Sequence, residues 1–199
     1  MSNKNKLGRL VQETAGFSYE FIRHPKKMGS VIPSSRMLAR AMRRTAQDLG
    51  HPESLIIEAG AGTGAITREL VAHFPRERLI INELNPRLAR RLRDRFKGST
   101  IRRGGVEQLE VWTYPQPKTI VSSLPFRSLP QEIAHSIETL FFTALRENPA
   151  NVLVQFTYGQ RSPLHLPPEA DIQAEKVNYA WLNFPPAHVW LYRSRQQEP

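Results

Sequence analysis

The sequence predicts an α/β fold in one domain, built on a mostly parallel sheet. Segments with strand character alternate along the chain with segments of helical periodicity, the pattern of parallel strands joined by helical crossovers. The last two strand candidates follow each other without a helix, so we expect an antiparallel edge. The third observation is a glycine-rich turn between the first strand and the next helix, in IIEAGAGTGAITREL (56–70).

The first 50 residues predict two helices joined by a basic loop. Apolar residues from Leu7 to Ile22 recur at near-helical spacing. The loop RHPKKMGSVIPSS (23–35) follows, and Ser34 or Ser35 caps a second helix that ends near Leu49 before Gly50. We expect residues 1–50 to form an N-terminal helical extension that covers the active site, and residues 51–199 to form the main domain.

The rest of the chain supplies the alternating elements. Apolar runs predict strands at 55–58, 79–82, 119–122 and 151–157, a short one around Ile101, and a final pair at 177–183 and 188–192. Helical patterns cover 63–74, 86–96 and 130–146, and the second of these has Pro86 in its first turn, where a proline is tolerated.

Composition limits the classes of protein and of site. The chain has 199 residues, of which 40% are hydrophobic and 23% charged, as in globular proteins. The absence of cysteine excludes disulfides and thiolate chemistry. The six histidines show no ligand spacing, so we infer no metal. We see no signal peptide and no apolar stretch of the roughly 20 residues that a membrane span needs.

Positive charge is concentrated at the beginning of the chain. Residues 1–50 hold ten Lys or Arg and three acidic residues, so they carry +7 of the net charge of +10. A block of this kind indicates a polyanionic partner, either nucleic acid or an anionic membrane surface. The alternative is that the charge only favours solubility.

The glycine turn predicts a nucleotide-like cofactor. Gly60, Gly62 and Gly64 allow a tight turn on which a ligand can lie, and the following helix offers free N–H groups. Glu83 ends the next strand, where a ribose-binding carboxylate is expected. A nicotinamide dinucleotide and S-adenosylmethionine both fit. The acid that precedes the first glycine favours S-adenosylmethionine, as does the short chain, which leaves no room for the substrate domain of a dehydrogenase.

These residues carry a family resemblance. IIEAGAGTGAITREL, NELNP (82–86) and SSLPF (122–126) resemble class I S-adenosylmethionine-dependent methyltransferases. The resemblance implies a Rossmann-like, seven-stranded sheet and S-adenosylmethionine as the cofactor. It also implies a set of cofactor-binding residues, which is Ser30, Glu58, Gly60, Gly62, Thr63, Gly64, Glu83, Leu84 and Ser122.

Two families of this class share the pattern, namely the bacterial rRNA adenine dimethyltransferases and the bacterial phospholipid N-methyltransferases. Three further stretches are similar to the phospholipid enzymes: KKMGSVIPSS (26–35), VQFTYGQRSPL (154–164) and FPPAHVWLYR (184–193). The rRNA enzymes carry a helical domain after the sheet, and this chain stops at the last strand. The resemblance therefore implies N-methylation of phosphatidylethanolamine.

One position departs from the class pattern. An acid that holds the adenine amino group usually follows the third strand, but in IRRGGVEQL (101–109) Gly105 stands there. Either Glu107 substitutes for the missing acid, or apolar contacts hold the adenine.

The strand end SSLPF is the expected acceptor site. By resemblance it takes the place of the Asn-Leu-Pro-Tyr motif of amine methyltransferases, in which a side-chain oxygen and a backbone carbonyl accept hydrogens of the amine. Methyl transfer is an in-line displacement, so positioning dominates catalysis. The expected catalytic set is Ser123, Leu124, Pro125, Phe126, Tyr158 and Tyr19. The alternative for Ser122 and Ser123 is a capped turn.

Several roles stay open. The residues do not decide which group deprotonates the incoming ammonium, and Glu20, Glu58, Tyr19 and Tyr158 are the candidates. Four aromatic residues either line a cage for the cationic headgroup or, as we favour, belong to the core; they are Tyr158, Tyr179, Trp181 and Trp190.

We expect a monomer that works from the cytoplasmic side and docks peripherally on anionic lipid through residues 1–50, with no nucleic-acid partner. The first helix either lies in the headgroup layer or only covers the sheet. Three rivals remain: an rRNA or other nucleic-acid adenine N6-methyltransferase, a non-catalytic lipid-binding protein and a dehydrogenase.

Overall fold

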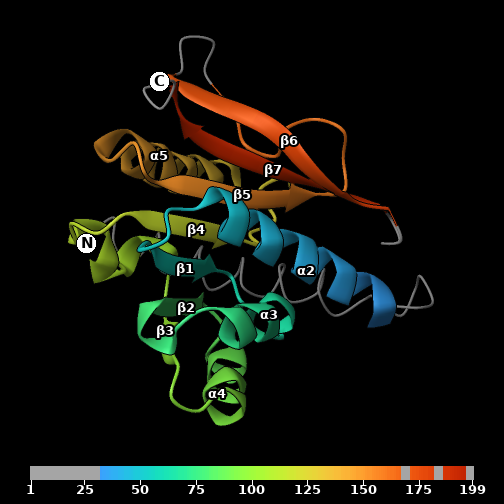
Figure 1. Ribbon diagram of the computed structural model, residues 1–199, viewed down its shortest axis with the longest axis vertical. Helices are drawn as coiled ribbons and strands as arrows, with labels where there is room; N and C mark the ends of the chain where they lie inside the picture. Colours follow the sequence, from blue (N-terminus) through green and yellow to red (C-terminus); the bar gives the residue numbers. More distant parts are fainter. Residues whose placement is uncertain (1–31, 167–170, 182–185, 196–199) are drawn as a thin grey trace.

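The computed structural model describes residues 32–166, 171–181 and 186–195 as one α/β unit (Figure 1). Its strands are β1 (Leu55–Ala59), β2 (Leu79–Glu83), β3 (Thr100–Arg103), β4 (Lys118–Ser122), β5 (Val152–Thr157), β6 (Ile172–Ala180) and β7 (Ala187–Ser194). Its α-helices are α2 (Ile32–Leu49), α3 (Ala65–His73), α4 (Pro86–Arg95) and α5 (Gln131–Glu147). Short 3₁₀ turns occupy Arg76–Arg78, η3 (Val106–Gln108) and η4 (Glu110–Thr113).

The strands form one seven-stranded sheet in the order β3-β2-β1-β4-β5-β7-β6. The pairs β1–β2, β1–β4, β2–β3 and β4–β5 are parallel, and β7 runs antiparallel to both of its neighbours. This confirms the predicted mostly parallel sheet with an antiparallel edge. The antiparallel strand β7 lies between β5 and the edge strand β6. The β6–β7 hairpin thus pairs with β5 through β7, its second strand.

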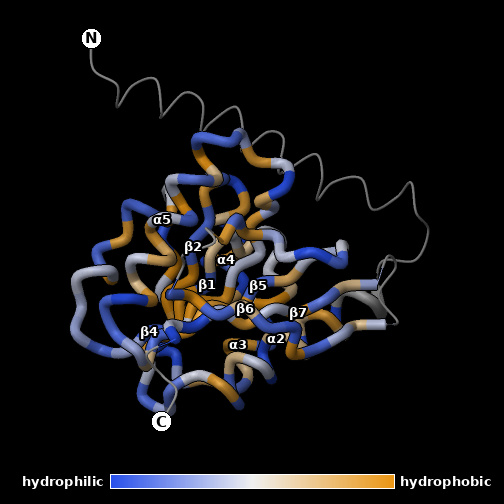
Figure 2. Tube along the Cα trace, turned by 90° about the horizontal axis from the view of Figure 1, so that it is seen from above, coloured by the Kyte–Doolittle hydropathy of each residue, from blue (hydrophilic) through white to orange (hydrophobic). Residues whose placement is uncertain are grey.

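Helices cover both faces of the sheet (Figure 2). Alternate residues of each central strand point to opposite faces. Ile57, Ile120 and Leu153 pack with α5, whereas Ile56, Val121 and Val154 pack with α2 and α3. α4 lies on the α2–α3 face, since its Leu92 packs on Ile81, two residues along β2 from Leu79 of the α2–α3 cluster. α2, which the sequence assigns to the extension, thus buries Leu38 and Met42 in the core.

Several element boundaries differ from the sequence prediction. Helix α2 begins at Ile32, so Ser34 and Ser35 lie inside the helix and the prediction that one of them caps it was wrong. The third helix begins at Ala65 and not at Thr63, because Gly64 has φ 82° and stands outside the helix. Strand β6 begins at Ile172, five residues before the predicted 177. Its first half contains the exposed Glu175 and Lys176 on the open edge of the sheet, so it shows no apolar run.

The predicted helix from Leu7 to Ile22 and the basic loop after it lie outside the described residues. In the part of the chain that the structure covers, no helix is both long and apolar enough to span a bilayer.

Candidate functional site

The carboxyl ends of β1 and β4 form the point at which the strand order reverses. The chain proceeds from β1 outward to β2 and β3, then returns to place β4 on the other side of β1. Open α/β sheets bind ligands in the crevice at such a point. Here Ala59 stands opposite Ser122 in register, and the Ser123 N–H donates to the Ala59 carbonyl at 2.9 Å. The glycine turn and the SSLPF turn are therefore adjacent.

The glycine turn has the backbone conformation that its sequence predicts. Gly60, Gly62 and Gly64 have φ of 76°, 58° and 82°, all in the left-handed region that disfavours residues with a side chain. A Cβ on Gly60 would lie 2.8 Å from Cδ2 of Leu124, so the two turns touch closely. The N–H groups of Gly60 and Ala61 donate to the Asn82 carbonyl at 3.1 and 3.0 Å, which ties the turn to the end of β2.

Glu83 joins the glycine turn to the start of α4. Its Oε2 accepts the Gly62 N–H at 2.7 Å and its Oε1 accepts the Asn85 N–H at 2.7 Å. Burial raises the pKa of Glu83, and the backbone hydrogen bonds oppose that rise. Each oxygen of a carboxylate offers two lone pairs, so one on each oxygen stays free for the two hydroxyls of a ribose.

The next helix starts where NELNP predicts. The Asn85 side chain accepts the N–H groups of Arg87 and Leu88 at 2.9 and 3.3 Å, and Pro86 fills the first helical position. This capping fixes the end of β2 and with it the position of Glu83.

Glu58 is a buried acid with one oxygen that has no partner. The residue is fully buried, and Thr67 Oγ1 donates to its Oε2 at 2.7 Å, whereas its Oε1 makes no hydrogen bond. Burial raises its pKa to about 8, and the nearby Glu83 adds to the rise. An orphaned acceptor beside the glycine turn fits a ligand that brings a cationic donor, such as the ammonium group of S-adenosylmethionine.

The carboxylate of Glu107 lies where the side chain of an acid at position 105 would begin. A Cβ built on Gly105 would overlap the carboxylate of Glu107. Gly105 precedes the turn η3, which carries Glu107 back over it. The Glu107 carboxylate therefore lies where a side chain at position 105 would be, and that it holds the adenine amino group stays a prediction.

The SSLPF turn keeps its own polar groups largely occupied. Ser122 Oγ accepts the Leu124 N–H at 3.3 Å, and the Leu124 carbonyl accepts the Phe126 N–H at 3.0 Å and Gln155 Nε2 at 3.1 Å. Ser123 is half-buried at the crevice. The ring of Phe126 is only 5% exposed and packs edge-on against Phe141 of α5. Contact of that ring with a cationic headgroup stays a prediction.

Gln155 is a candidate that the sequence analysis did not find. It stands opposite Ser122 in the β4–β5 register and is 1% exposed. Its Nε2 donates to the carbonyls of Leu124 and Phe156, and its Oε1 has no partner. A lone amide within the apolar run of β5 was the available signal. This oxygen is a free buried acceptor next to the predicted acceptor site.

The remaining predicted residues divide into three groups. Tyr19 and Ser30 lie outside the described residues. Thr63 and Leu84 flank the glycine turn and Glu83, as expected from their places in the chain. Pro125 closes the SSLPF turn, since its carbonyl accepts the Ser128 N–H at 2.7 Å.

The core assignment of the four aromatic residues was wrong for three of them. Trp190 is 9% exposed and lies in the core, but Tyr158, Tyr179 and Trp181 are 44%, 47% and 65% exposed. They stand at the ends of β5 and of the edge strand β6, where no described helix covers them. Tyr158 packs edge-on against Phe156, and Tyr179 stacks on His188.

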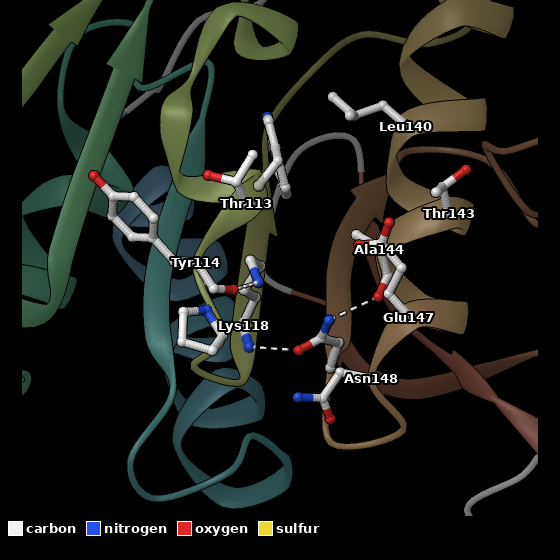
Figure 3. A pocket seen from close by; sticks show the side chains of 11 residues that line it. Thr113, Tyr114, Lys118, Leu140, Thr143, Ala144, Glu147 and Asn148 are labelled. Carbon is white, nitrogen blue, oxygen red and sulfur yellow. Dashed lines mark hydrogen bonds between the residues drawn. The ribbon is translucent and has the colours of Figure 1, made fainter.

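Two cavities lie near these elements, and they differ in position. One, of about 290 Å³, lies between the glycine turn and α4 and is lined by Gly62, Thr63, Leu88, Arg91, Leu92 and Arg95. The other, of about 450 Å³, lies at the opposite end of the sheet, around Lys118 at the start of β4 (Figure 3). Four residue steps separate Lys118 from Ser122, or about 13 Å. The larger cavity is therefore not the cofactor crevice.

Comparison with solved structures identifies the fold. The chain superimposes on the 23S rRNA methyltransferase ErmE with a TM-score of 0.56 at 21% identity, over 80% of this chain and 69% of that one. A TehB-like SAM-dependent methyltransferase from Corynebacterium glutamicum gives 0.55 at 15%, over 92% and 99%. The fold is that of a class I SAM-dependent methyltransferase. The N-methyltransferase NodS from Bradyrhizobium japonicum gives 0.55 at 15%, over 82% and 97%.

The methyltransferase fold explains why the two turns meet at the reversal of strand order. Neighbours in this fold differ in what their names say they act on, from 23S rRNA to magnesium protoporphyrin IX. No family model and no curated protein sequence matches the chain. At these identities the comparisons establish the fold, and the substrate has to be argued from the residues of this chain.

Proposed function

We propose that the protein is an S-adenosylmethionine-dependent N-methyltransferase that methylates the amine of phosphatidylethanolamine at a membrane surface. The observation that carries the proposal is the contact between the glycine turn and the SSLPF turn at the strand-order reversal. It sets a cofactor cradle directly beside a set of hydrogen-bond acceptors. The likeness of residues 26–35, 154–164 and 184–193 to the phospholipid enzymes selects the lipid amine.

The cofactor half of the site has donors and acceptors for each part of S-adenosylmethionine. Glu83 would hold the ribose hydroxyls, Glu107 the adenine amino group, and the orphaned oxygen of Glu58 the ammonium group. When bound, the cofactor supplies a methyl group on a positively charged sulfur, which an amine nitrogen can attack.

The acceptor half needs to orient an amine and receive its hydrogens. Ser123 Oγ and Gln155 Oε1 are acceptors near the junction of the turns, and Gln155 Nε2 also donates to the Leu124 carbonyl and so fixes the position of the amide. A neutral amine would donate N–H bonds to these oxygens and direct its lone pair at the methyl group. Tyr158, exposed at the end of β5, would border the entrance.

Membrane access belongs to the same proposal. The lipid lies in a bilayer, so the enzyme would dock peripherally from the cytoplasmic side, with the basic residues 1–50 attracted to anionic headgroups. The rival, adenine N6-methylation of RNA, shares the cofactor cradle and a basic surface. The likeness to ErmE supports the common fold and gives no preference for RNA.

The test is methyl transfer from labelled S-adenosylmethionine to phosphatidylethanolamine vesicles and to rRNA, assayed side by side. We expect label in the lipid, and Ser123→Ala to lower turnover while affinity for S-adenosylhomocysteine stays the same. Ser128→Ala, an exposed serine of the same loop, is the matched control and keeps full turnover. Label that enters RNA and not lipid would establish the rival.

A further inference from the structure

The two helical layers of the sheet carry opposite charge. On the α2–α3–α4 side, the described side chains include ten arginines and three acidic residues. On the other side, η3, η4 and α5 hold five glutamates and one arginine. Figure 2 shows α2 and α3 on one side of the strands and α5 on the other. The asymmetry was not visible in the sequence, because it arises only when separate segments come together on one face.

Helix α4 is the most basic element of this side. In ten residues it has five arginines, all exposed, and one acid, Asp94. Its apolar positions, Leu88, Ala89 and Leu92, are buried against the sheet. Lys97 and the exposed Arg102 and Arg103 follow, so residues 86–103 contain eight basic residues.

These charges are not neutralised within the described protein. Its two salt bridges are Arg40–Glu69 at 3.7 Å and Arg146–Asp171 at 2.7 Å, and neither involves α4. Unpaired like charges on one short helix repel one another. A surface of this kind is stabilised by an external polyanion, and guanidinium groups match phosphate oxygens in geometry.

The arginines of α4 lie next to the cofactor turn. Arg91 and Arg95 line the cavity beside Gly62 and Thr63, and Arg95 Nη1 lies 3.4 Å from the Thr63 carbonyl. Arg90 and Arg93 are three residues apart on a neighbouring stripe of α4, Lys97 follows the end of the helix, and no described residue pairs with their side chains. An anionic surface bound to this stripe would lie close to the active-site crevice.

We propose that the stripe formed by Arg90 and Arg93 of α4 and by Lys97, two residues after its end, is an electrostatic docking surface for the phosphate layer of an anionic lipid membrane. It is a second contact, separate from residues 1–50, and it rests on the proposed lipid substrate. Two attachments, one on each side of the cofactor turn in sequence, would fix how the crevice is oriented on the bilayer.

The composition of the face favours a membrane over RNA. Proteins that bind single-stranded RNA stack bases on exposed aromatic side chains. The described side chains of α2, α3 and α4 include no exposed Phe, Tyr or Trp. Arginines without aromatic side chains for stacking suit the phosphate layer of a membrane, which is bound through its charge and offers no bases to stack.

The experiment compares two variants of the full chain that lose the same charge. The test variant is Arg90→Gln, Arg93→Gln and Lys97→Gln, which leaves Arg91 and Arg95 beside the cofactor turn in place. The control is Arg146→Gln, Arg161→Gln and Lys176→Gln, three exposed residues outside the α2–α3–α4 side; Lys176 stands opposite Trp190, which packs on the α5 face. Co-sedimentation is measured with vesicles of phosphatidylcholine and phosphatidylglycerol at several salt concentrations, and with rRNA fragments.

Each basic residue near an anionic surface contributes about fivefold to binding. We therefore expect the test variant to bind vesicles roughly 10- to 100-fold more weakly than the wild type, with a smaller salt dependence, and the control variant to lose much less. Equal vesicle binding by the test variant and the wild type would overturn the docking surface. Loss of rRNA binding with unchanged vesicle binding would assign the stripe to RNA.

A second assay separates this inference from the proposed function. Phosphatidylethanolamine in neutral detergent micelles offers the amine without an anionic surface, so the test variant should methylate it at the wild-type rate. Methylation in micelles together with wild-type vesicle binding by the variant would refute only the docking stripe. Charge-dependent docking through the stripe without any lipid methylation would refute only the proposed function.

Discussion

The buried acid Glu58 makes the stability of the ligand-free protein depend on pH. Burial raises the pKa of Glu58 to about 8, from an ordinary value of 4.5. Between these two values the folded state holds a proton that the unfolded state releases, so the free energy of unfolding falls as pH rises. A full pKa unit corresponds to about 1.4 kcal/mol, and the whole window to about 3–5 kcal/mol. Below pH 4.5 Glu58 is protonated in the folded and the unfolded state, so this loss of stability is absent. Above about pH 8 it is ionised in both states, and the loss no longer changes with pH.

Glu58→Gln removes the titration and keeps the shape of the side chain. Urea unfolding of both proteins at pH 5, 6, 7 and 8, without ligand, should show the variant gaining about 1 kcal/mol per pH unit relative to the wild type. The new amide N–H group, left without a partner, costs about 1–3 kcal/mol at every pH. This cost shifts the free energy of unfolding of the variant by the same amount at every pH. The test therefore compares the slopes of the free energy of unfolding against pH.

Two comparisons complete that test. Glu132→Gln, an exposed acid in the first turn of α5, should follow the wild type at every pH. Saturating S-adenosylhomocysteine should flatten the wild-type slope, because its ammonium group would favour the ionised form of Glu58. Parallel stability curves for Glu58→Gln and the wild type would refute the reasoning from burial.

Three further predictions test the geometry of the site. Gly60→Ala, forced into φ 76°, should lose about 1–2 kcal/mol of stability and also bind S-adenosylhomocysteine more weakly in calorimetry. Gly98→Ala at φ 82° should show the backbone cost alone and no change in affinity, because its Cβ would meet only the end of the Arg76 side chain at 3.4 Å, whereas a Cβ on Gly60 also meets Leu124 at 2.8 Å. Gln155→Leu should lower turnover on phosphatidylethanolamine at least tenfold with cofactor affinity unchanged, and full turnover would exclude the amide from the acceptor site. Glu107→Ala should weaken S-adenosylhomocysteine binding by about 1–3 kcal/mol, and adding Gly105→Asp should restore part of it.

The fold was accessible from the sequence because its signals are local. The strands β1, β2 and β4 each contain a short apolar run (55–57, 79–81 and 120–121), as expected of parallel strands covered on both faces. The glycines that end β1 and the Asn-Pro pair that starts α4 fix the neighbouring boundaries. Strand β6 lacked such a signal, because an edge strand with one open face keeps charged residues along its length.

The site was accessible only in part, because its polar groups are defined by distant partners. The glycine turn, Glu83 and SSLPF stand out as motifs, and the structure brings them together. Gln155 lies in the stretch 154–164 that resembles the phospholipid enzymes, but its place beside Ser122 depends on the register of β5 with β4. The burial of Phe126 depends on Phe141, fifteen positions further along the chain. Burial and register of this kind arise from packing, which spacing within one segment does not encode.

At position 105 the chain departs from the class pattern, and in the structure the carboxylate of Glu107 lies at that position. The chain has glycine where the class pattern has an acid, so the sequence alone predicts that the cofactor site lacks one contact. The backbone at Gly105 has φ −65° and ψ 148°, a conformation open to any residue, so glycine is not required there by the turn. The carboxylate of Glu107, at the end of an exposed side chain, fills the space of a side chain at position 105 and would have to move to admit one. The acid and the glycine therefore form one unit: an acid at 105 would compete with Glu107 for the same volume and repel its charge. Gly105→Asp alone should thus weaken cofactor binding, and together with Glu107→Ala it should recover, a sign reversal that no independent role for either residue would produce.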